Sequence, residues 1–301
     1  MERRAVRSKV NPGEKIFLRP ASLEEAWRAF EAADGDAVYL AGGTDVMVNY
    51  KKKRIRPRVF ISLNGLTGYD RVSLASEEIL LGGLTTLETL AADPLVAAHL
   101  PGLRDAAGNM ASPQIRAVAT LGGNLANAAP SADTAPPLLS HGAAVVLASP
   151  GGLRRVPLDE FFLAPGRAAM SPGEIIVSVA APLPRPPCGG GYVKVSRRKA
   201  MDLALLGVAV HLEFQTDRGT CQLARVALGV AGPVPARARE AEDYLTGRGI
   251  NAESLAEAGR LAAAESSCRD SLRGEAWYRR EMIRVHVRRL GLRALEMAQA
   301  V

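Results

Sequence analysis

Two short glycine segments hold the residues that are best suited to chemistry in this chain. In chain order they read Ala41-Gly42-Gly43-Thr44-Asp45 and Thr120-Leu121-Gly122-Gly123-Asn124. Each segment places two adjacent glycines beside a hydroxyl donor, and glycine lets the backbone turn sharply and approach a ligand closely. Successive backbone N–H groups in such a turn form a concave site for an anion such as phosphate. Two such segments in one chain predict a diphosphate that is held from two sides.

Each segment taken alone is also compatible with an ordinary tight turn, which is a common use of glycine. Neither segment has the G-x-G-x-x-G spacing of a Rossmann dinucleotide site or the G-x-x-x-x-G-K-[ST] spacing of a P-loop. From these residues alone, the prediction is a dinucleotide site outside those two families.

The composition predicts a globular chain of two domains with a basic surface. The chain has 301 residues, of which 48% are hydrophobic, so it can bury a sizeable core. The net charge is +7, and many of the cations lie in residues 51–58 and 273–293. Such runs are either solvated faces or contacts for an acidic protein or a nucleic acid. Aromatic residues do not interleave with the runs, so we expect no nucleic-acid partner.

Cysteine and histidine are too scattered to predict a metal centre. The three cysteines contain no C-x-x-C pair, and each of the four histidines is expected to be structural or on the surface. A sparse, odd number of cysteines suits the reducing cytoplasm. No apolar run reaches the length of about 18 residues that a membrane span needs. The charged start Met1–Arg4 also lacks the apolar segment of a signal peptide.

Periodicity and capping signals predict the elements that must position the two glycine segments. Ser22 and Glu25 form a capping box that opens a helix over residues 22–33. Strands at 37–40 and 58–63 complete a βαβ-like opening around the first segment. The second segment is expected to be a loop, and Thr86 is expected to cap a helix before it. The other predicted elements of this part are strands at 79–84, 143–147 and 173–179 and a helix at 101–109.

A change in composition predicts the domain boundary. Residues 182–187 are rich in proline and are followed by Gly189, Gly190 and Gly191, which we interpret as a linker. Beyond it, three antiparallel strands are expected at 192–196, 203–214 and 222–229, followed by helices at 236–245, 252–264 and 274–300. Strands followed by helices indicate an α+β domain. We therefore predict domains at 1–183, with subdomains 1–64 and 65–183, and at 188–301.

Taken together, these segments resemble the FAD-binding subunit of molybdenum hydroxylases. That family includes the medium subunit of bacterial carbon monoxide dehydrogenase and the flavin domain of xanthine dehydrogenase. The resemblance covers nearly the whole chain and implies an α+β fold, with a two-subdomain FAD-binding domain of the vanillyl-alcohol oxidase type before the C-terminal domain. It rests on the two glycine segments and on Gly83 to Thr86, Pro130-x-x-Asp133, Glu174-Ile175-Ile176, Lys194-x-x-Arg197-Arg198-x-x-x-Asp202-Leu203-Ala204 and Tyr278-Arg279-Arg280.

The resemblance also implies which residues bind FAD. The backbone amides of the two glycine segments would hold the pyrophosphate, with Thr44 and Thr120 close to its oxygens. Asn124 and Asp133 match positions that hydrogen-bond the cofactor, and Ile176 and Lys194 match an apolar and a cationic contact. From the residues alone, Asp133 could also be a turn cap and Lys194 a surface lysine. Neither glycine segment contains Cys or His, so we expect the FAD to be noncovalent.

The function implied by the resemblance is electron transfer without a catalytic side chain. Molybdenum-pterin and 2Fe-2S clusters are then expected only on partner chains, a molybdenum-binding subunit and an iron–sulfur subunit. The electron acceptor could be NAD, a quinone or another carrier. Two alternatives stay open: a self-contained FAD-dependent reductase of the same fold, and a non-catalytic basic nucleotide-binding or RNA-binding module.

Overall fold

The computed structural model describes residues 14–300, and the chain divides between Thr67 and Gly68 into two compact units. The charged start Met1–Arg4 lies outside the described residues. Within the described part, no helix combines the length and the apolar character needed to cross a membrane.

The first unit is a parallel three-stranded sheet with short helices. Its strands β1 (Ile16–Leu18), β3 (Val59–Ser62) and β2 (Ala37–Leu40) lie side by side in that order. Helix α1 (Leu23–Ala32) connects β1 to β2 and begins at Ser22, whose hydroxyl accepts the N–H of Glu25 as predicted. The first glycine segment follows β2 and leads into α2 (Val46–Lys51), and a 3-10 turn, η1 (Leu63–Gly65), follows β3. The βαβ opening predicted from the sequence is therefore present.

The second unit contains an antiparallel five-stranded sheet. Its order is β4 (Val72–Leu74), β5 (Glu78–Gly82), β10 (Ile175–Pro182), β6 (Ala144–Ser149) and β7 (Gly152–Pro157). A small hairpin joins β8 (Phe162–Ala164) to β9 (Arg167–Ala168). The helices of this part are α3 (Leu87–Ala92), α4 (Pro94–His99), α5 (Pro101–Gly108), α6 (Pro113–Arg116), α7 (Leu121–Ala126), α8 (Ala135–Ser140) and α9 (Leu158–Phe161). Thr86 caps α3 by accepting the N–H of Thr89, as predicted.

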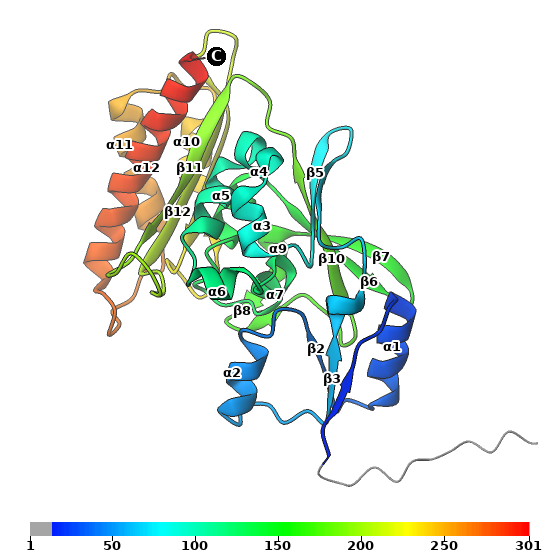
Figure 1. The fold of residues 1–301 in the computed structure, drawn as a ribbon. Helices are drawn as coiled ribbons and strands as arrows, with labels where there is room; N and C mark the ends of the chain where they lie inside the picture. Colours follow the sequence, from blue (N-terminus) through cyan, green and yellow to red (C-terminus); the bar gives the residue numbers. More distant parts are fainter. Residues whose placement is uncertain (1–13, 301) are drawn as a thin grey trace, which may run out of the picture. The chain divides into compact units, whose positions relative to one another are not determined.

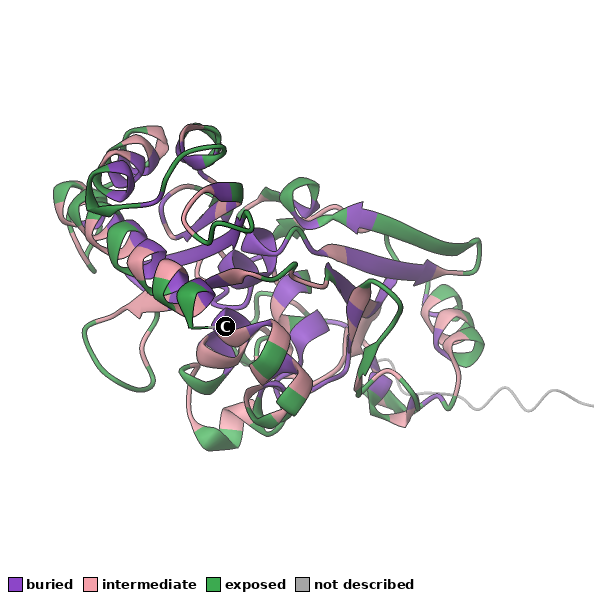
Figure 2. Ribbon diagram, turned by 90° about the horizontal axis from the view of Figure 1, so that it is seen from above, coloured by how far each residue is buried: buried purple, intermediate pink, exposed green. Residues whose placement is uncertain are grey.

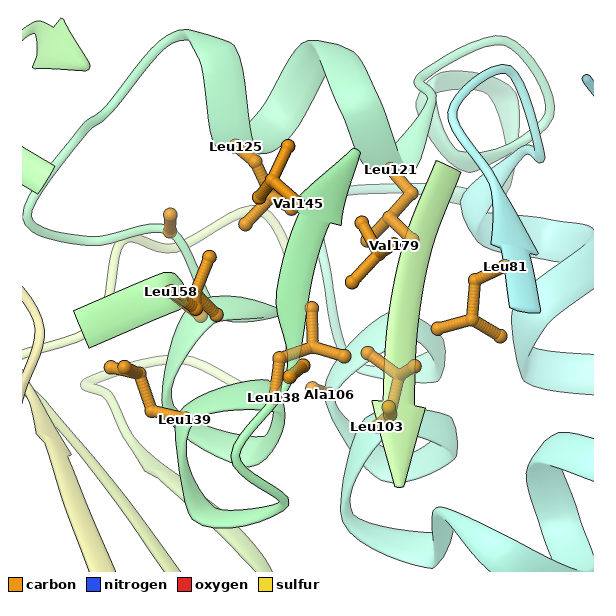
Figure 3. Packing of buried hydrophobic residues seen from close by; sticks show 14 of the residues in the cluster. Leu81, Leu103, Ala106, Leu121, Leu125, Leu138, Leu139, Val145, Leu158 and Val179 are labelled. Carbon is orange, nitrogen blue, oxygen red and sulfur yellow. The ribbon is translucent and has the colours of Figure 1, made fainter. Parts of the chain in front are cut away.

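The core of this part lies between the five-stranded sheet and the helices. Figure 3 shows Leu121 and Leu125 of α7 beside Val179 and Val145 of the two neighbouring strands β10 and β6. All four side chains are fully buried. Burial of each such side chain stabilises the fold by about 1.5–3 kcal/mol, so this packing anchors α7 firmly on the sheet.

The C-terminal part of the second unit is a four-stranded antiparallel sheet that helices cover. Its strands are β11 (Cys188–Val195), β12 (Leu206–Phe214), β13 (Cys221–Gly229) and β14 (Ala236–Arg237). The helices are α10 (Arg239–Leu245), α11 (Ala252–Glu265) and α12 (Ala276–Gln299). The sequence predicted three strands; β14 is a two-residue strand that lies where the start of a helix was expected. The α+β fold class itself is confirmed.

Helices lie on both faces of this sheet. Figure 1 shows α11 and α12 along one face of β11 and β12, and α5 beside the other face. Every residue of β12 is buried for this reason. Buried and exposed residues alternate along α12, so only one side of that helix contacts the sheet (Figure 2).

The three glycines that were interpreted as linker are part of strand β11, so that prediction was wrong. A Cβ atom on Gly189 would lie 2.5 Å from the carbonyl oxygen of Ala294 in α12. A Cβ atom on Gly190 would lie 2.0 Å from the carbonyl oxygen of Val210 in β12. Glycine is required here because the strand packs directly against the main chain of its neighbours, and not because the chain is a flexible connection.

Candidate functional site

The second glycine segment forms the first turn of helix α7, where the sequence had predicted a loop. Thr120 is the N-cap residue, and its hydroxyl accepts the N–H of Gly123 at 3.1 Å. The N–H of Leu121 donates to Thr85, that of Gly122 to Gly83, and that of Asn124 to Thr120. The amides of residues 121–124 are therefore all paired within the chain, so this segment can offer a ligand its side chains more readily than its backbone.

Close main-chain packing explains the first of the two glycines of this segment. A Cβ atom on Gly122 would lie 2.6 Å from the carbonyl oxygen of Gly83. A Cβ atom on Gly83 would in turn lie 2.0 Å from the carbonyl oxygen of Ile176 on β10. Three backbone segments thus stack without intervening side chains, which brings the predicted residues Gly122 and Ile176 into one place. Ile176 itself is 5% exposed and belongs to the core.

Asn124 connects α7 to the segment that carries Asp133. The Oδ1 atom of Asn124 accepts a hydrogen bond of 2.6 Å from the Thr134 hydroxyl. An asparagine side chain also has an NH₂ group with two donor hydrogens. Because Thr134 already binds the oxygen, while the described residues provide no partner for the NH₂ group, the NH₂ group is the part of Asn124 that is best able to bind a ligand.

Asp133 and Lys194 form a buried ion pair. The Lys194 Nζ atom lies 2.8 Å from Asp133 Oδ2, and the two side chains are 9% and 5% exposed. The Tyr192 hydroxyl donates to Asp133 Oδ1 at 2.7 Å. Burial raises the pKa of the Asp133 carboxyl, and the charge and hydrogen bond of Lys194 and the hydrogen bond from Tyr192 oppose that shift. Burial and the nearby Asp133 also raise the pKa of Tyr192 well above its ordinary value, so its hydroxyl stays a donor.

Tyr192 was not among the residues predicted for the site, although the sequence contained a signal for it. Tyr192 and Lys194 are two positions apart on β11, and alternate residues of a strand point to the same face. A lysine assigned to a site therefore implies that the residues two positions away share its surroundings. The prediction that Lys194 is a surface lysine, which the residues alone left open, is wrong, since its side chain is buried.

Glu174, the first residue of a predicted motif, has a structural role. Arg154 binds its carboxylate through two hydrogen bonds of 2.6 and 2.7 Å, and the N–H of Ser171 donates to it at 2.6 Å. These contacts lower the pKa of the Glu174 carboxyl, with the hydrogen bond from Arg154 as the main cause. The pair joins β7 to the turn before β10, so it supports the strand that carries Ile176.

The first glycine segment lies in the first unit and is described by itself. Gly43 has a φ of +71°, a left-handed conformation that favours glycine. Among the residues that the structure describes, the N–H groups of Gly42, Gly43 and Thr44 have no acceptor. Asp45 precedes α2, and its side chain makes no capping hydrogen bond. This turn, unlike the second segment, therefore has backbone donors that a ligand could use.

The structure joins the predicted residues of the second unit into one connected network, the candidate site. Main-chain packing links α7 to β10, a side-chain hydrogen bond links α7 to the Asp133 segment, and the ion pair links that segment to β11. The members of this site are Thr120, Gly122, Gly123, Asn124, Asp133, Ile176 and Lys194, with Tyr192 added. The five residues of the first segment, Ala41, Gly42, Gly43, Thr44 and Asp45, form the turn between β2 and α2 in the other unit.

Comparison with known proteins identifies the family of this chain. The model of the FAD binding domain in molybdopterin dehydrogenase matches residues 9–184, and the model of the CO dehydrogenase flavoprotein C-terminal domain matches residues 191–294. The xanthine dehydrogenase FAD-binding subunit of Escherichia coli is 34% identical over 90% of this chain and 91% of that protein. The carbon monoxide dehydrogenase medium chain of Afipia carboxidovorans is 31% identical over 96% of this chain and 98% of that protein.

A solved structure agrees with these relatives. Carbon monoxide dehydrogenase from Hydrogenophaga pseudoflava contains a chain that matches with a TM-score of 0.88 and 30% identity, over 97% of this chain and 99% of that one. The matches span both domain models and nearly the full length of the relatives. This chain therefore belongs to the family of FAD-binding subunits of the molybdenum-containing dehydrogenases and is an oxidoreductase component.

Proposed function

We propose that this chain is the FAD-binding electron-transfer subunit of a multi-subunit molybdenum hydroxylase. It takes electrons from iron–sulfur clusters on a partner subunit and passes them to an external acceptor. The observation that carries the proposal is a buried ammonium group, Lys194, which is held by Asp133, itself held by Tyr192, within a chain of this family. A buried ammonium that a carboxylate holds in place suits ligand binding better than covalent catalysis.

The donor groups of each unit suit parts of a cofactor with a diphosphate and a flat ring system. The unpaired N–H groups of Gly42, Gly43 and Thr44 match phosphate oxygens. In the second unit, the NH₂ group of Asn124 and the remaining N–H groups of Lys194 can donate to polar atoms of a cofactor, since an ammonium has three donors and Asp133 takes one. Asp133 would then act by holding Lys194, and Ile176 through the small part of its apolar side chain that stays exposed.

When bound, FAD supplies the redox chemistry, because a flavin can accept electrons one at a time and give them in pairs. The chain itself would bind the cofactor, orient it and adjust its redox properties. The positive charge of Lys194 would favour negative charge on a neighbouring part of the cofactor. Burial strengthens that effect by keeping water away. Asp133 keeps the ammonium in one position. Thr120 caps α7 and so keeps Asn124 in place.

The proposal includes partners that carry the other centres. An iron–sulfur subunit and a molybdenum-binding subunit would hold the 2Fe-2S clusters and the molybdenum-pterin, and the acceptor would be NAD, a quinone or another carrier. The basic residues 51–54 would meet an acidic face of the iron–sulfur subunit. We place the complex in the cytoplasm, and the absence of disulfides among the three cysteines supports a reducing compartment.

The test is the absorbance spectrum of the chain purified with its partner subunits, followed by reduction. We expect flavin bands at about one FAD per chain, and acid precipitation should release the flavin into the supernatant. Substrate should reduce the flavin only when the iron–sulfur and molybdenum subunits are present. A preparation without flavin would contradict the FAD assignment. Rapid reduction of the isolated chain by a small organic substrate would instead favour the self-contained reductase.

Salt dependence tests the contact with the partner separately. If residues 51–54 meet an acidic surface, the complex should weaken as the salt concentration rises, because surface charges are screened over about 10 Å at 0.1 M salt. Replacing Lys51, Lys52, Lys53 and Arg54 with glutamine should weaken assembly in low salt and remove most of the salt dependence. Assembly that does not depend on the salt concentration would contradict this contact, but it would leave the FAD assignment unaffected.

A further inference from the structure

Arg279 is an unusual residue of α12 because it is a buried cation without a counter-ion. It is 5% exposed and, among the residues that the structure describes, takes part in no ion pair. Arginine stays charged at any ordinary pH, so its burial without an anion is costly. The neighbouring Arg280, by contrast, is exposed to solvent. The burial of Arg279 with so few hydrogen bonds therefore requires a structural explanation.

Those contacts fasten two turns to α12. The Nη2 atom donates to the Ser271 hydroxyl at 2.6 Å, and the Nη1 atom donates to the carbonyl oxygen of Val230 at 3.4 Å. The Nε atom is buried and has no partner. Arg279 is therefore shielded from water and lacks a hydrogen-bond partner at Nε, but it binds the carbonyl oxygen of Val230.

Val230 is itself in a strained conformation. Its φ is +60°, which a β-branched residue rarely adopts. Its N–H donates to the carbonyl oxygen of Pro130 at 3.2 Å, while its own carbonyl accepts from Arg279. Just before it, Gly229 packs so closely that a Cβ atom would lie 2.9 Å from Pro136. The end of β13 therefore touches both sides of the segment that carries Asp133.

That segment, residues 129–134, is held by a small number of hydrogen bonds, and Val230 makes one of them. Within the described part of the chain, the N–H of Val230 provides the one main-chain hydrogen bond between this segment and an element distant in sequence, in addition to the side-chain hydrogen bonds of Thr134 and Asp133. Its other main-chain hydrogen bonds are local turns, such as the N–H of Ala132 to the carbonyl of Ala129. Misplacement of the segment by even one ångström would disturb the 2.8 Å contact between Asp133 and Lys194.

We infer that Arg279 is a positioning residue for the cofactor site. It holds Val230 in the left-handed conformation, Val230 holds Pro130, and the segment then presents Asp133 to Tyr192 and Lys194. Two hydrogen bonds thus connect the C-terminal helix to the segment that carries Asp133, and the Asp133–Lys194 contact completes the path to the buried ammonium. The effect on FAD rests on the proposed function, whereas the effect on the segment itself does not.

The experiment compares Arg279→Met with Arg280→Met, a matched change at the adjacent exposed arginine. FAD affinity is measured by flavin fluorescence in the full chain assembled with its partner subunits. Hydrogen exchange of the peptide covering 127–138 is measured by mass spectrometry in the full chain without flavin. A third variant, Val230→Gly, removes the strain, because glycine adopts positive φ without steric cost. The double variant, Arg279→Met with Val230→Gly, completes the set.

We expect Arg279→Met to bind FAD about tenfold more weakly and to exchange faster over 127–138, and Arg280→Met to match the wild type. Val230→Gly should restore most of the affinity to the Arg279 variant, a rescue that general destabilisation would not give. Equal affinity and equal exchange in the two methionine variants would overturn the inference. If Arg279→Met does not fold, Arg279→Lys, which keeps the charge and can reach one acceptor, should show an intermediate loss. A wild-type chain without flavin would refute the proposed function, and the exchange data would still decide the role of Arg279.

Discussion

Removal of the Asp133 carboxylate is the change to which the site should respond most strongly. In Asp133→Ala, the Lys194 ammonium stays buried with 9% of its side chain exposed, and the Tyr192 hydroxyl loses its acceptor. Loss of one partner of a buried ion pair typically costs about 3–5 kcal/mol, because the other charge is left uncompensated. We therefore expect the free energy of unfolding to fall by about 4 kcal/mol, well above the roughly 1 kcal/mol of an average substitution.

A double-mutant cycle separates this charge effect from simple loss of packing. Lys194→Met leaves Asp133 with the hydrogen bond from Tyr192, and burial already raises the pKa of that carboxyl, so it can become neutral. We expect this single change to cost about 1–3 kcal/mol. With both changes, no buried charge remains, so the double variant should be more stable than Asp133→Ala alone.

The assay is urea denaturation of the flavin-free full chain at pH 7, with Asp243→Ala as the control. Asp243 is an exposed aspartate of α10, and its replacement should change stability by no more than about 0.5 kcal/mol. The reasoning would be refuted by a loss below about 1 kcal/mol in Asp133→Ala. It would be refuted equally by a double variant whose loss is the sum of the two single losses, since residues in contact should couple.

Three further predictions concern the glycines and a buried histidine. Gly43→Val should abolish FAD binding in the assembled complex, because φ of +71° strains a β-branched residue; full flavin occupancy would contradict the role of the first segment. Gly122→Ala should lower the melting temperature more than Gly123→Ala, since its Cβ would meet a main-chain oxygen at 2.6 Å rather than a side-chain hydroxyl; equal melting temperatures would count against this. Burial, the facing His211 and a nearby arginine lower the pKa of His141 well below 6.5, so protonation favours the unfolded chain. The free energy of unfolding should therefore fall by up to about 1.4 kcal/mol per pH unit as the pH drops below 6.5, and His141→Asn should flatten that slope in denaturation measured from pH 7 to 5.

The sequence by itself determined the features that depend on a few neighbouring residues. Ser22 and Thr86 cap their helices as predicted, because a hydroxyl three residues before an N–H is a local arrangement. The βαβ opening and the α+β character followed from the same kind of signal. Family resemblance supplied the list of site residues, since the motifs keep their order along the chain.

The tertiary structure decided what those residues touch. The sequence could not show whether Gly122 and Gly189 lie in loops, because the close main-chain contacts that require glycine come from Gly83 and from Ala294. The pairing of Asp133 with Lys194, 61 positions away, likewise depends on how β11 packs beside the segment after α7. Local patterns reflect the energetics of one turn or one strand, whereas a buried ion pair exists only after two distant segments have been brought together and water has been excluded. The sequence therefore specifies the residue types of the candidate site, and the contacts between them form only when the chain folds.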